Sequence, residues 1–507
     1  MAHACAFALV TALVLPVGAA HAGAVNAIGP DFDGDGFADL AIGAPGDLYQ
    51  RGSASVVHGG AQSYGLARMQ VWSQNSAGVA GVAERGDGFG AALAAGDFDA
   101  DGYDDLAIGA PGENSSAGAV NVLYGQADVG LSAAGNQLFT QDTPGIAGVA
   151  RAHDEFGGAL TVGDFDGDGY DDLAIDAGFD TVAGGARAGA VHVVFGGTNG
   201  LGVARSQHLD QNDAGVPSDG RTEEYFGWSL AAGDFDRDGR DDLAIGAPMD
   251  RVPGSGVVGG SVTVVRGSAN GLTTSGIRYL WQSRAGMSDT SEHEDMFGWS
   301  VAAGDLDTDG YDDLAIGTPL EDANWFAPVI DAGLVHILYG GWNGIVTTGA
   351  DRVSPWLNGP RDDMQPGDAF GVALLVADIG NNRAKLVVGS PYEDTSKPDA
   401  GQVMTFYAPG KAGTTTSGHT TYIGSDQHGY WGFALGSGDF DGSGRTNLAI
   451  GAPGAAVIRD GQNQVYSQFA GYVRVYTFGH NEISQGFMPE LGDPRWYDYF
   501  GFALPAG

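Results

Sequence analysis

The chain has 507 residues, a formal net charge of −40 and a hydrophobic content of 43%. That hydrophobic content supplies a large core, so the charge does not indicate a disordered chain. A strongly acidic surface is repelled by nucleic acid and by anionic membranes, and we exclude both as partners. The length would permit several domains, but the regular repetition described below favours one closed domain.

The first 22 residues are expected to be a signal peptide. Residues 6–17 form an apolar run, and Ala20-His21-Ala22 is typical of a small-residue cleavage site. The run is shorter than the roughly 20 residues that span a membrane, so we expect no membrane span and a mature domain over residues 23–507. The single cysteine, Cys5, lies in this segment, so the mature chain would have no disulfide and bound cations could stabilise it instead.

An acidic nonapeptide, Asp-x-Asp-x-Asp-Gly-x-x-Asp, is repeated along the chain, and each copy continues into Leu-Ala-Ile. The five strong copies begin at Asp31, Asp97, Asp164, Asp234 and Asp305. A degenerate relative begins at Asp378 and a weakened copy at Asp439, and successive copies lie about 60 to 75 residues apart. Repetition at this period predicts a single architecture for the whole mature chain.

Each repeat follows one template of four short apolar runs. In the second repeat an aromatic-Gly pair, Phe89-Gly90, leads to the acidic loop; the runs 106–111, 118–125 and 137–139 follow. Each run has the length and composition of a β-strand and is bounded by Gly or Pro. Four antiparallel strands per unit predict an all-β propeller of seven blades.

The two ends of the chain carry complementary halves of one unit. The loop at Asp31 has no aromatic-Gly pair before it, and the pair at Phe500 has no acidic loop after it. Joined, they complete one blade, so we expect the N- and C-terminal segments to pair and close the ring. Closure removes free sheet edges. The alternative is that Phe500 opens an eighth blade.

These units resemble the FG-GAP repeats of the integrin α-subunit β-propeller and its bacterial secreted relatives. The resemblance rests on the Phe-Gly pairs, the acidic loops and the Gly-Ala-Pro runs, and it covers about residues 28–507. It implies a seven-bladed β-propeller with calcium in the loop between the first and second strands of certain blades. The third unit departs from the pattern, with Asp176-Ala177-Gly178 in place of Gly-Ala-Pro.

The acidic loops have the residue types of a calcium site. Carboxylates at positions 1, 3, 5 and 9, with a backbone carbonyl at position 7, form an all-oxygen set, which suits calcium better than zinc or magnesium. The glycine at position 6 permits a sharp turn at positive φ. The expected ligands are Asp31, Asp33, Asp35, Phe37 and Asp39; Asp97, Asp99, Asp101, Tyr103 and Asp105; Asp164, Asp166, Asp168, Tyr170 and Asp172; Asp234, Asp236, Asp238, Arg240 and Asp242; and Asp305, Asp307, Asp309, Tyr311 and Asp313.

Two other interpretations of these loops fit less well. An EF-hand would need a Glu at position 12, which is Ile in all five copies, and helical flanks. Asx turns without metal would leave the clustered carboxylates to repel one another. We therefore expect structural calcium sites in which every acid serves as a ligand. The seventh loop, with Asp439 and Asp441, should be weak or empty, and the sixth should hold no metal.

The variable loops are expected on the face opposite the acidic loops, where specificity normally resides. The largest are residues 320–331 and 454–471; Trp325 and Phe326 in the first either contact a ligand or pack on the next blade. The triplet Arg85-Gly86-Asp87 is an adhesive motif or, more simply, another acid before an aromatic-Gly pair. For Trp228 and Trp299, which follow Phe-Gly, packing between blades is the preferred interpretation.

The sequence contains no catalytic motif such as Gly-x-Ser-x-Gly or His-Glu-x-x-His. We therefore expect a non-enzymatic, monomeric, secreted or cell-surface module that binds an extracellular protein or glycan. The alternative is a propeller hydrolase or lyase that uses acids with His153 or His293, although solvated loop histidines are the simpler interpretation. A scaffolding role in a larger surface assembly is a third possibility.

Overall fold

The computed structural model describes most of the chain between residues 29 and 487. The described ranges are 29–60, 68–182, 187–213, 215–216, 220–221, 223–287, 289–322, 329–355, 365–380, 383–394, 397–407, 419–454, 457–458, 465–467, 471–476 and 485–487. The expected signal peptide, Trp325 and Phe326, most of the 454–471 loop, and the Phe500 segment lie outside these ranges.

In the described part of the chain the strands form seven antiparallel sheets of three or four strands, which are the blades of a β-propeller, and one separate two-stranded hairpin. Blade 1 contains β1 (Leu40–Ala44), β2 (Ser53–Val57) and β3 (Met69–Trp72). Blade 2 contains β4 (Ala92–Gly96), β5 (Asp105–Ala110), β6 (Ala119–Tyr124) and β7 (Ser132–Phe139). Blade 3 contains β8 (Leu160–Gly163), β9 (Asp172–Ala177), β10 (Ala190–Phe195) and β11 (Gly202–Asp210). Blade 4 contains β12 (Ser229–Gly233), β13 (Asp242–Ala247), β14 (Ser261–Arg266) and β15 (Thr273–Leu280).

The remaining blades keep the same order. Blade 5 contains β16 (Ser300–Gly304), β17 (Asp313–Thr318), β18 (Leu334–Tyr339) and β19 (Val346–Val353). Blade 6 contains β20 (Ala373–Ala377), β21 (Lys385–Ser390), β22 (Gln402–Phe406) and β23 (His419–Ile423). Blade 7 contains β24 (Ala434–Gly438), β25 (Asn447–Ala452), β28 (Tyr472–Tyr476) and β29 (Gln485–Phe487), with a separate hairpin of β26 (Val457–Ile458) and β27 (Val465–Ser467). Two one-turn helices, α1 (Asp47–Gln50) and α2 (Glu113–Ser116), lie between the second and third runs of blades 1 and 2.

The residues of each blade change with distance from the centre of the ring. The first strands of blades 2, 4 and 5 are short and rich in Ala and Gly, because neighbouring first strands pack directly on one another there. The second and third strands are buried along their length, whereas the outer strands have exposed residues at their middle. Side chains therefore change from small and buried at the first strand to partly exposed at the outer strand, as expected when the first strand of each sheet lies nearest the central axis. The all-β, seven-bladed prediction is confirmed.

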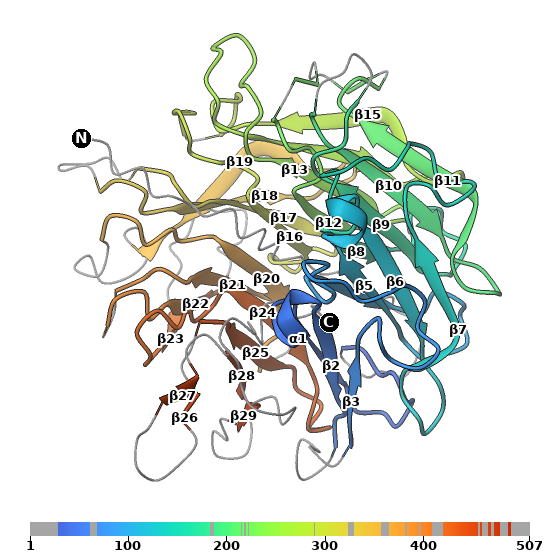
Figure 1. Ribbon diagram of the computed structural model, residues 1–507. Helices are drawn as coiled ribbons and strands as arrows, with labels where there is room; N and C mark the ends of the chain where they lie inside the picture. The colour runs from blue at the N-terminus through green and yellow to red at the C-terminus, as the bar shows by residue number, and fades with distance from the viewer. Residues whose placement is uncertain are drawn as a thin grey trace.

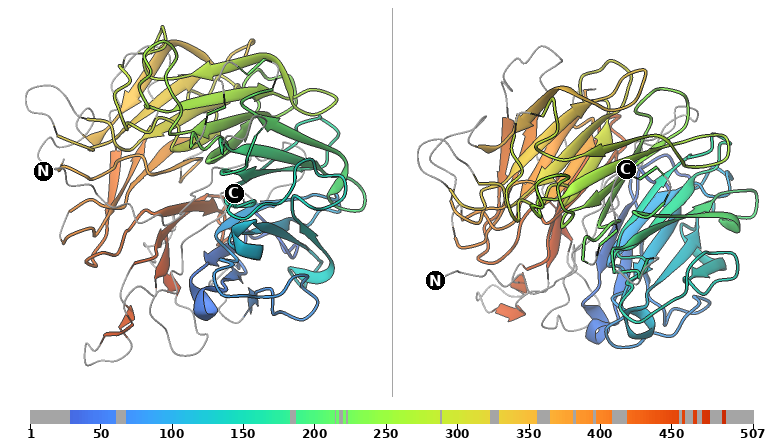
Figure 2. Two further views of the ribbon diagram at one scale, coloured as in Figure 1. Left: turned by 45° about the horizontal axis from the view of Figure 1, so that its top comes forward. Right: turned by 90° about the horizontal axis from the view of Figure 1, so that it is seen from above.

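The blades succeed one another in chain order around the ring (Figure 1). In the further views the first and last blades are again neighbours (Figure 2). A hydrophobic cluster joins them, with Leu40 and Ile42 of blade 1 packed with Val473 and Val475 of blade 7. The Ala38 amide also donates to the Asp439 carbonyl at 3.2 Å. Blade 1 therefore contacts blade 7, while the pairing expected for the Phe500 segment is outside the described residues.

The aromatic-Gly pairs fasten each blade to the one before it. The amide of the buried Phe156 donates to the Ala117 carbonyl of blade 2 at 3.1 Å, and the Gly157 amide donates to Asp176 of its own blade at 2.9 Å. The same pair of contacts recurs at Phe297 and Gly298, which donate to Gly259 and Gly317. The repeated dipeptide is thus an inter-blade joint.

Strand direction assigns the connecting loops to two faces. The pairing of Gly96 with Asp105 places the acidic loop at one end of blade 2, and the turn after β6 lies there too, because the Gly125 amide donates to the Asp105 carboxylate at 2.9 Å. We call this end the Asp-loop face. The connections from second to third strand, and from each blade to the next, lie on the other end, which we call the opposite face. Among the described residues, no helix has the length and apolar character needed to cross a membrane.

Candidate functional site

The acidic loops are closed by hydrogen bonds from the backbone to the first carboxylate. The amides of Gly36, Gly102, Gly169, Gly239 and Gly310 donate to the position-1 carboxylates of Asp31, Asp97, Asp164, Asp234 and Asp305 at 2.9 to 3.0 Å. These position-6 glycines have φ between +84° and +92°, as predicted. Position 4 is also left-handed, at Gly34, Ala100, Gly167, Arg237 and Thr308, which the motif did not indicate.

Positions 5 and 7 form a second set of turns. The amides of Phe37, Tyr103, Tyr170, Arg240 and Tyr311 donate to the position-5 carboxylates of Asp35, Asp101, Asp168, Asp238 and Asp309 at 3.0 to 3.2 Å. Each position-7 amide therefore holds the position-5 acid against the loop.

The predicted ligand carboxylates converge. Oxygens of Asp31, Asp33 and Asp35 lie within 4.8 Å of one another, as do those of Asp97, Asp99 and Asp105 and those of Asp164, Asp166 and Asp172. In blades 3 and 4, one oxygen each of Asp166, Asp236 and Asp242 is buried and has no hydrogen-bond partner. Buried carboxylate oxygens without a donor are costly unless a cation faces them. The loops fit a hard cation with oxygen ligands.

The position-9 acids have a second task that the sequence did not indicate. Both oxygens of Asp105 accept backbone hydrogen bonds, from Phe98 at 3.0 Å and from Gly125 at 2.9 Å. Asp172 and Asp313 repeat this arrangement. Burial raises the pKa of Asp105 to about 9. In these three blades the position-9 carboxylate therefore ties the start of the loop to the end of the third strand, besides being available to a metal.

Position 8 carries an inter-blade contact that sequence reasoning missed. The carboxylates of Asp104, Asp171, Asp241 and Asp312 accept the position-1 amide of the preceding loop at 2.7 to 3.0 Å. The signal was available, because position 8 is Asp in four consecutive strong copies. These acids join neighbouring loops into one belt.

Three of the strong loops hold a guanidinium from their own blade. Arg68 contacts Asp33, Arg205 contacts Asp166, and Arg266 lies 3.1 Å from Asp236. Blade 1 adds a histidine, because His58 Nδ1 lies 3.2 Å from Asp33 and 3.0 Å from Asp39. In blade 4, Arg240 adds a second guanidinium, with its Nη1 3.3 Å from Asp238 Oδ2, so the loops of blades 1 and 4 each hold two basic side chains.

The two degenerate loops differ from each other. In blade 6, Lys385 Nζ donates to the Ile379 carbonyl at 2.6 Å, so a side-chain ammonium enters the loop that lacks its acids. In blade 7 the amides of Ser443 and Gly444 still donate to Asp439, at 2.9 and 2.7 Å. The seventh loop keeps the turn with fewer acids, and the predictions for both loops stand as predictions.

A pocket lies on the opposite face at the point where the repeat departs from its pattern. It is lined by Pro111, Glu155, Gly158, Asp176, Gly178, Phe179 and Trp228, from blades 2, 3 and 4. Elsewhere the position of Asp176 is a glycine; a Cβ on Gly109 would lie 2.0 Å from the Gly157 carbonyl of the next blade. Asp176 therefore marks a blade junction unlike those in blades 2 and 5.

Two carboxyls of this pocket are held in a low-dielectric setting. Asp176 accepts amide hydrogen bonds from Ala159 and Gly178, and burial raises its pKa well above 3.8. Burial also raises the pKa of Glu155 to about 7. Glu155 has a positive φ of +56°. Residues at the same position before other aromatic-Gly pairs have similar values, such as +60° at Tyr225 and +53° at Ala369. Perturbed acids in a concave site are typical of binding and catalytic sites.

Aromatic side chains continue from the pocket across two blades. Phe179 contacts Tyr225 with ring centroids 4.9 Å apart, and Trp228 contacts Trp299 at 4.9 Å. Arg187 lies over Phe179 at 5.5 Å. The contact of Trp228 with Trp299 supports the predicted packing between blades.

The other candidates from the sequence are placed less favourably. Asp87 of Arg85-Gly86-Asp87 is 2% exposed and its carboxylate accepts the Glu84 amide, so it serves the loop rather than an adhesive surface. His153 and His293 are exposed and belong to the loops before blades 3 and 5. Neither lines the pocket.

Together, the ring of blades and the acidic loops define a seven-bladed β-propeller with a belt of cation-type loops on one face. The model of the FG-GAP repeat matches residues 22–58, 89–123, 156–194, 226–265 and 297–338, which confirms the resemblance in these five units.

Relatives place this repeat in larger proteins. The chain is 29% identical over 269 residues to integrin alpha-PS2 of Drosophila melanogaster, covering 50% of this chain and 17% of the integrin. It is 29% identical over 318 residues to phosphatidylinositol-glycan-specific phospholipase D of Mus musculus, covering 59% of this chain and 34% of that enzyme. The chain thus spans 17% of the integrin and 34% of the phospholipase. A rhamnogalacturonan lyase structure aligns with a TM-score of 0.36 and 14% identity over 79% of this chain and 64% of its own, so the two folds are only loosely alike.

Proposed function

We propose that this protein is a secreted or cell-surface binding module that engages an extracellular protein or glycan through its opposite face. The observation that carries the proposal is the pocket at Asp176, where aromatic and acidic side chains gather beside a blade junction in which Asp176 takes the place of the usual glycine. The similarity to integrin alpha-PS2 supports a module of this kind, and we propose that it acts as a monomer.

The pocket offers two forms of recognition. Phe179 and Trp228 present aromatic surface, on which the apolar face of a sugar ring or an aliphatic chain packs. Glu155 accepts hydrogen bonds from hydroxyls or pairs with a cationic side chain. A glycan or a basic protein segment fits this chemistry, and an anionic ligand does not.

A binding screen against glycans and cell-surface proteins, run with calcium present, tests this proposal. The ligand it identifies should bind at least about 10-fold more weakly to Phe179→Ala, because that change removes aromatic contact surface from the pocket. Trp342→Ala is the matched control, since Trp342 is 83% exposed and lies on the Asp-loop face. Loss of binding in Trp342→Ala with no effect of Phe179→Ala would place recognition on the Asp-loop face and contradict the proposal.

The second candidate is an enzyme acting on an extracellular polymer or ester. It is favoured by one observation, the two carboxyls with raised pKa in one pocket, of which Glu155, at about 7, could act as a general acid or base near neutral pH. In this version the histidines named from the sequence, His153 and His293, have no part, because they are absent from the pocket lining.

A screen of hydrolase and lyase substrates separates the two functions. Turnover that falls by about 100-fold or more in Glu155→Gln, with substrate binding retained, would establish catalysis. His153→Ala and His293→Ala serve as controls and should leave any turnover unchanged. Binding without turnover across the screen would favour the module.

We also propose that the five strong Asp loops bind calcium. The convergent carboxylates and the unpartnered buried oxygens of Asp166, Asp236 and Asp242 support this assignment. A bound cation would neutralise acids that burial and mutual repulsion now hold at raised pKa, such as Asp97. Chelation should therefore lower the melting temperature sharply, and calcium should restore it. A melting temperature indifferent to chelator and to calcium would contradict the assignment.

A further inference from the structure

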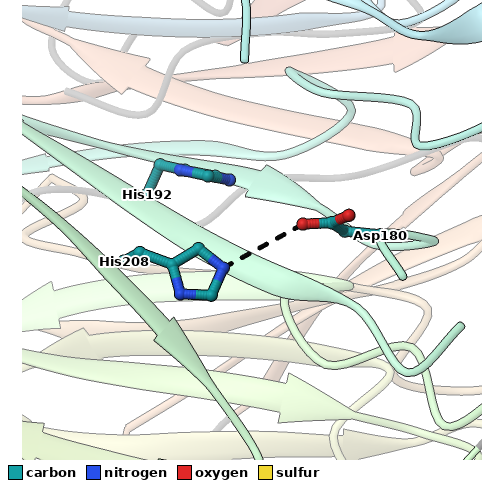
Figure 3. Close-up of side chains that lie close together, drawn as sticks. All are labelled: Asp180, His192 and His208. Atoms are coloured by element: carbon teal, nitrogen blue, oxygen red, sulfur yellow. Dashed lines mark ion pairs between the residues drawn. The ribbon is translucent and has the colours of Figure 1, made fainter. Parts of the chain in front are cut away.

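Two histidines and one aspartate meet in blade 3, away from the Asp loops. Ligand atoms of Asp180, His192 and His208 lie within 4.8 Å of one another. His192 lies on β10 and His208 opposite it on β11, while Asp180 lies in the connection from β9 to β10. Figure 3 shows the two rings and the carboxylate pointing toward one another, with His208 Nε2 4.0 Å from Asp180 Oδ2.

His192 has an unusual environment for a buried histidine. Its exposed fraction is 0%, and neither ring nitrogen has a hydrogen-bond partner. One oxygen of Asp180, which is 3% exposed, is also buried without a hydrogen-bond donor, and its nearest cation, Arg151 Nη1, lies 3.6 Å away. An imidazole always carries at least one N–H, so burying it without an acceptor costs free energy unless another group completes the site.

Blade 5 contains the same histidine with its partners in place. His336 occupies the equivalent position on β18, opposite Ile316 as His192 is opposite Ile175. Each ring packs edge-on against its aromatic-Gly phenylalanine at 5.3 Å. Yet His336 Nδ1 is 3.4 Å from Thr318 Oγ1, and its Nε2 is 3.2 Å from Asp289 Oδ2.

Blade 3 has replaced these partners. The position of Thr318 is Ala177, which has no hydroxyl, and the residue opposite the histidine on the outer strand is His208 instead of Arg352. The site has thus lost a donor, exchanged a cation for a second imidazole, and takes its carboxylate from Asp180 in the β9–β10 connection instead of from Asp289. Together, these changes leave His192 without hydrogen-bond partners and place two further potential metal ligands, His208 and Asp180, beside it.

We propose that Asp180, His192 and His208 form a binding site for a divalent transition metal, with Zn²⁺ as the expected ion. Two imidazoles and a carboxylate are a common ligand set for zinc with one position left for water. In a tetrahedral site the ligand atoms would be about 3.3 Å apart. Side-chain movements of about 1 Å would bring the ligand atoms of Asp180, His192 and His208 to that separation. Burial keeps His192 neutral, which is the form that coordinates metal.

The metal would fasten the outer half of blade 3 to the loop that carries Phe179. It would join β10, β11 and the residue that follows Phe179, so it would hold one wall of the pocket in place. Gln141, which is buried and lies beside the Asp180 carboxylate, would orient that ligand. The proposal stands independently of what the pocket binds.

Metal titration of the full, tag-free chain tests the proposal. Excess calcium is kept present so that the Asp loops do not take up the probe ion, and Zn²⁺ is added with calorimetric detection. We expect one equivalent of tight binding, and with Co²⁺ a visible absorption band of imidazole-bound metal. His192→Asn and His208→Asn should each weaken binding by at least about 10- to 100-fold.

His336→Asn is the matched control, because it removes a buried histidine of the same position that already has its partners. It should bind Zn²⁺ as the unaltered chain does. His208 is 24% exposed at its side chain, so His208→Asn should fold even where His192→Asn does not, and circular dichroism checks both. Absence of the single tight equivalent, or binding unchanged in His208→Asn, would overturn the proposal.

Discussion

At the residue scale, one carboxylate can serve a neighbouring blade more than its own loop. Asp104 illustrates this, since its oxygen accepts the Asp31 amide of blade 1 at 2.7 Å while its own amide donates to the Asp31 carbonyl. The nonapeptide motif Asp-x-Asp-x-Asp-Gly-x-x-Asp specifies no residue type at position 8. Its regular occupation by Asp is explained by this contact between loops.

Asp104→Ala should destabilise the protein by about 1 to 3 kcal/mol, because the Asp31 amide would lose its acceptor in a partly buried site. Asp104→Asn keeps an acceptor oxygen and should cost less. Thermal denaturation in saturating calcium measures both. Equal losses for the two variants would mean that the charge of Asp104, rather than its hydrogen bond, stabilises the joint.

At the element scale, the Phe-Gly and Gly-Ala-Pro segments are two halves of one joint. The glycine before Ala-Pro lies against the carbonyl of the next blade's aromatic-Gly pair, as at Gly109 and Gly157, where an added Cβ would be 2.0 Å from the oxygen. The repeat pattern therefore records packing between neighbouring blades. Where blade 3 carries Asp176 instead, the joint becomes part of a pocket.

Gly109→Ala should cost about 1 to 3 kcal/mol, because its Cβ would lie 2.0 Å from the Gly157 carbonyl and the blades would have to separate. Gly197→Ala is the control, since no atom lies within 4 Å of its added Cβ. Chemical denaturation compares the two. A loss in Gly197→Ala as large as in Gly109→Ala would refute the steric explanation.

At the scale of the whole molecule, the buried acids make stability depend on both pH and calcium. Burial raises the pKa of Asp104 to about 7, of Asp312 to about 6 and of Asp172 to about 8, above the ordinary value of 3.8. The folded protein therefore binds more protons than the unfolded chain between these values. Stability from this source is complete below about pH 4 and is lost as the pH rises through about 6 to 8.

In metal-free buffer the melting temperature should accordingly be higher at about pH 5 than at about pH 8. Calcium must displace protons from the same belt of acids, so the gain in melting temperature on adding calcium should grow as the pH rises. Scanning calorimetry with and without calcium at the two pH values measures this. A calcium gain that is larger at the lower pH would contradict the linkage.

The repeat, the strand order and the position of every Asp loop were determined by the sequence itself, because each depends on contacts within one unit of the chain. The resemblance of the loops to calcium sites could be seen there for the same reason. The departure at Asp176 was visible too, but not the pocket that accompanies it, since residues of three blades line that pocket.

Only the tertiary structure decided which side chains meet across strands and blades. His192 and His208 are neighbours because β10 and β11 pair in one register, and Asp104 reaches Asp31 because two blades stand side by side. A shift of one residue in a strand would turn each of these side chains to the other face of its sheet. Local pattern therefore defined the blade, and the packing of blades defined the sites.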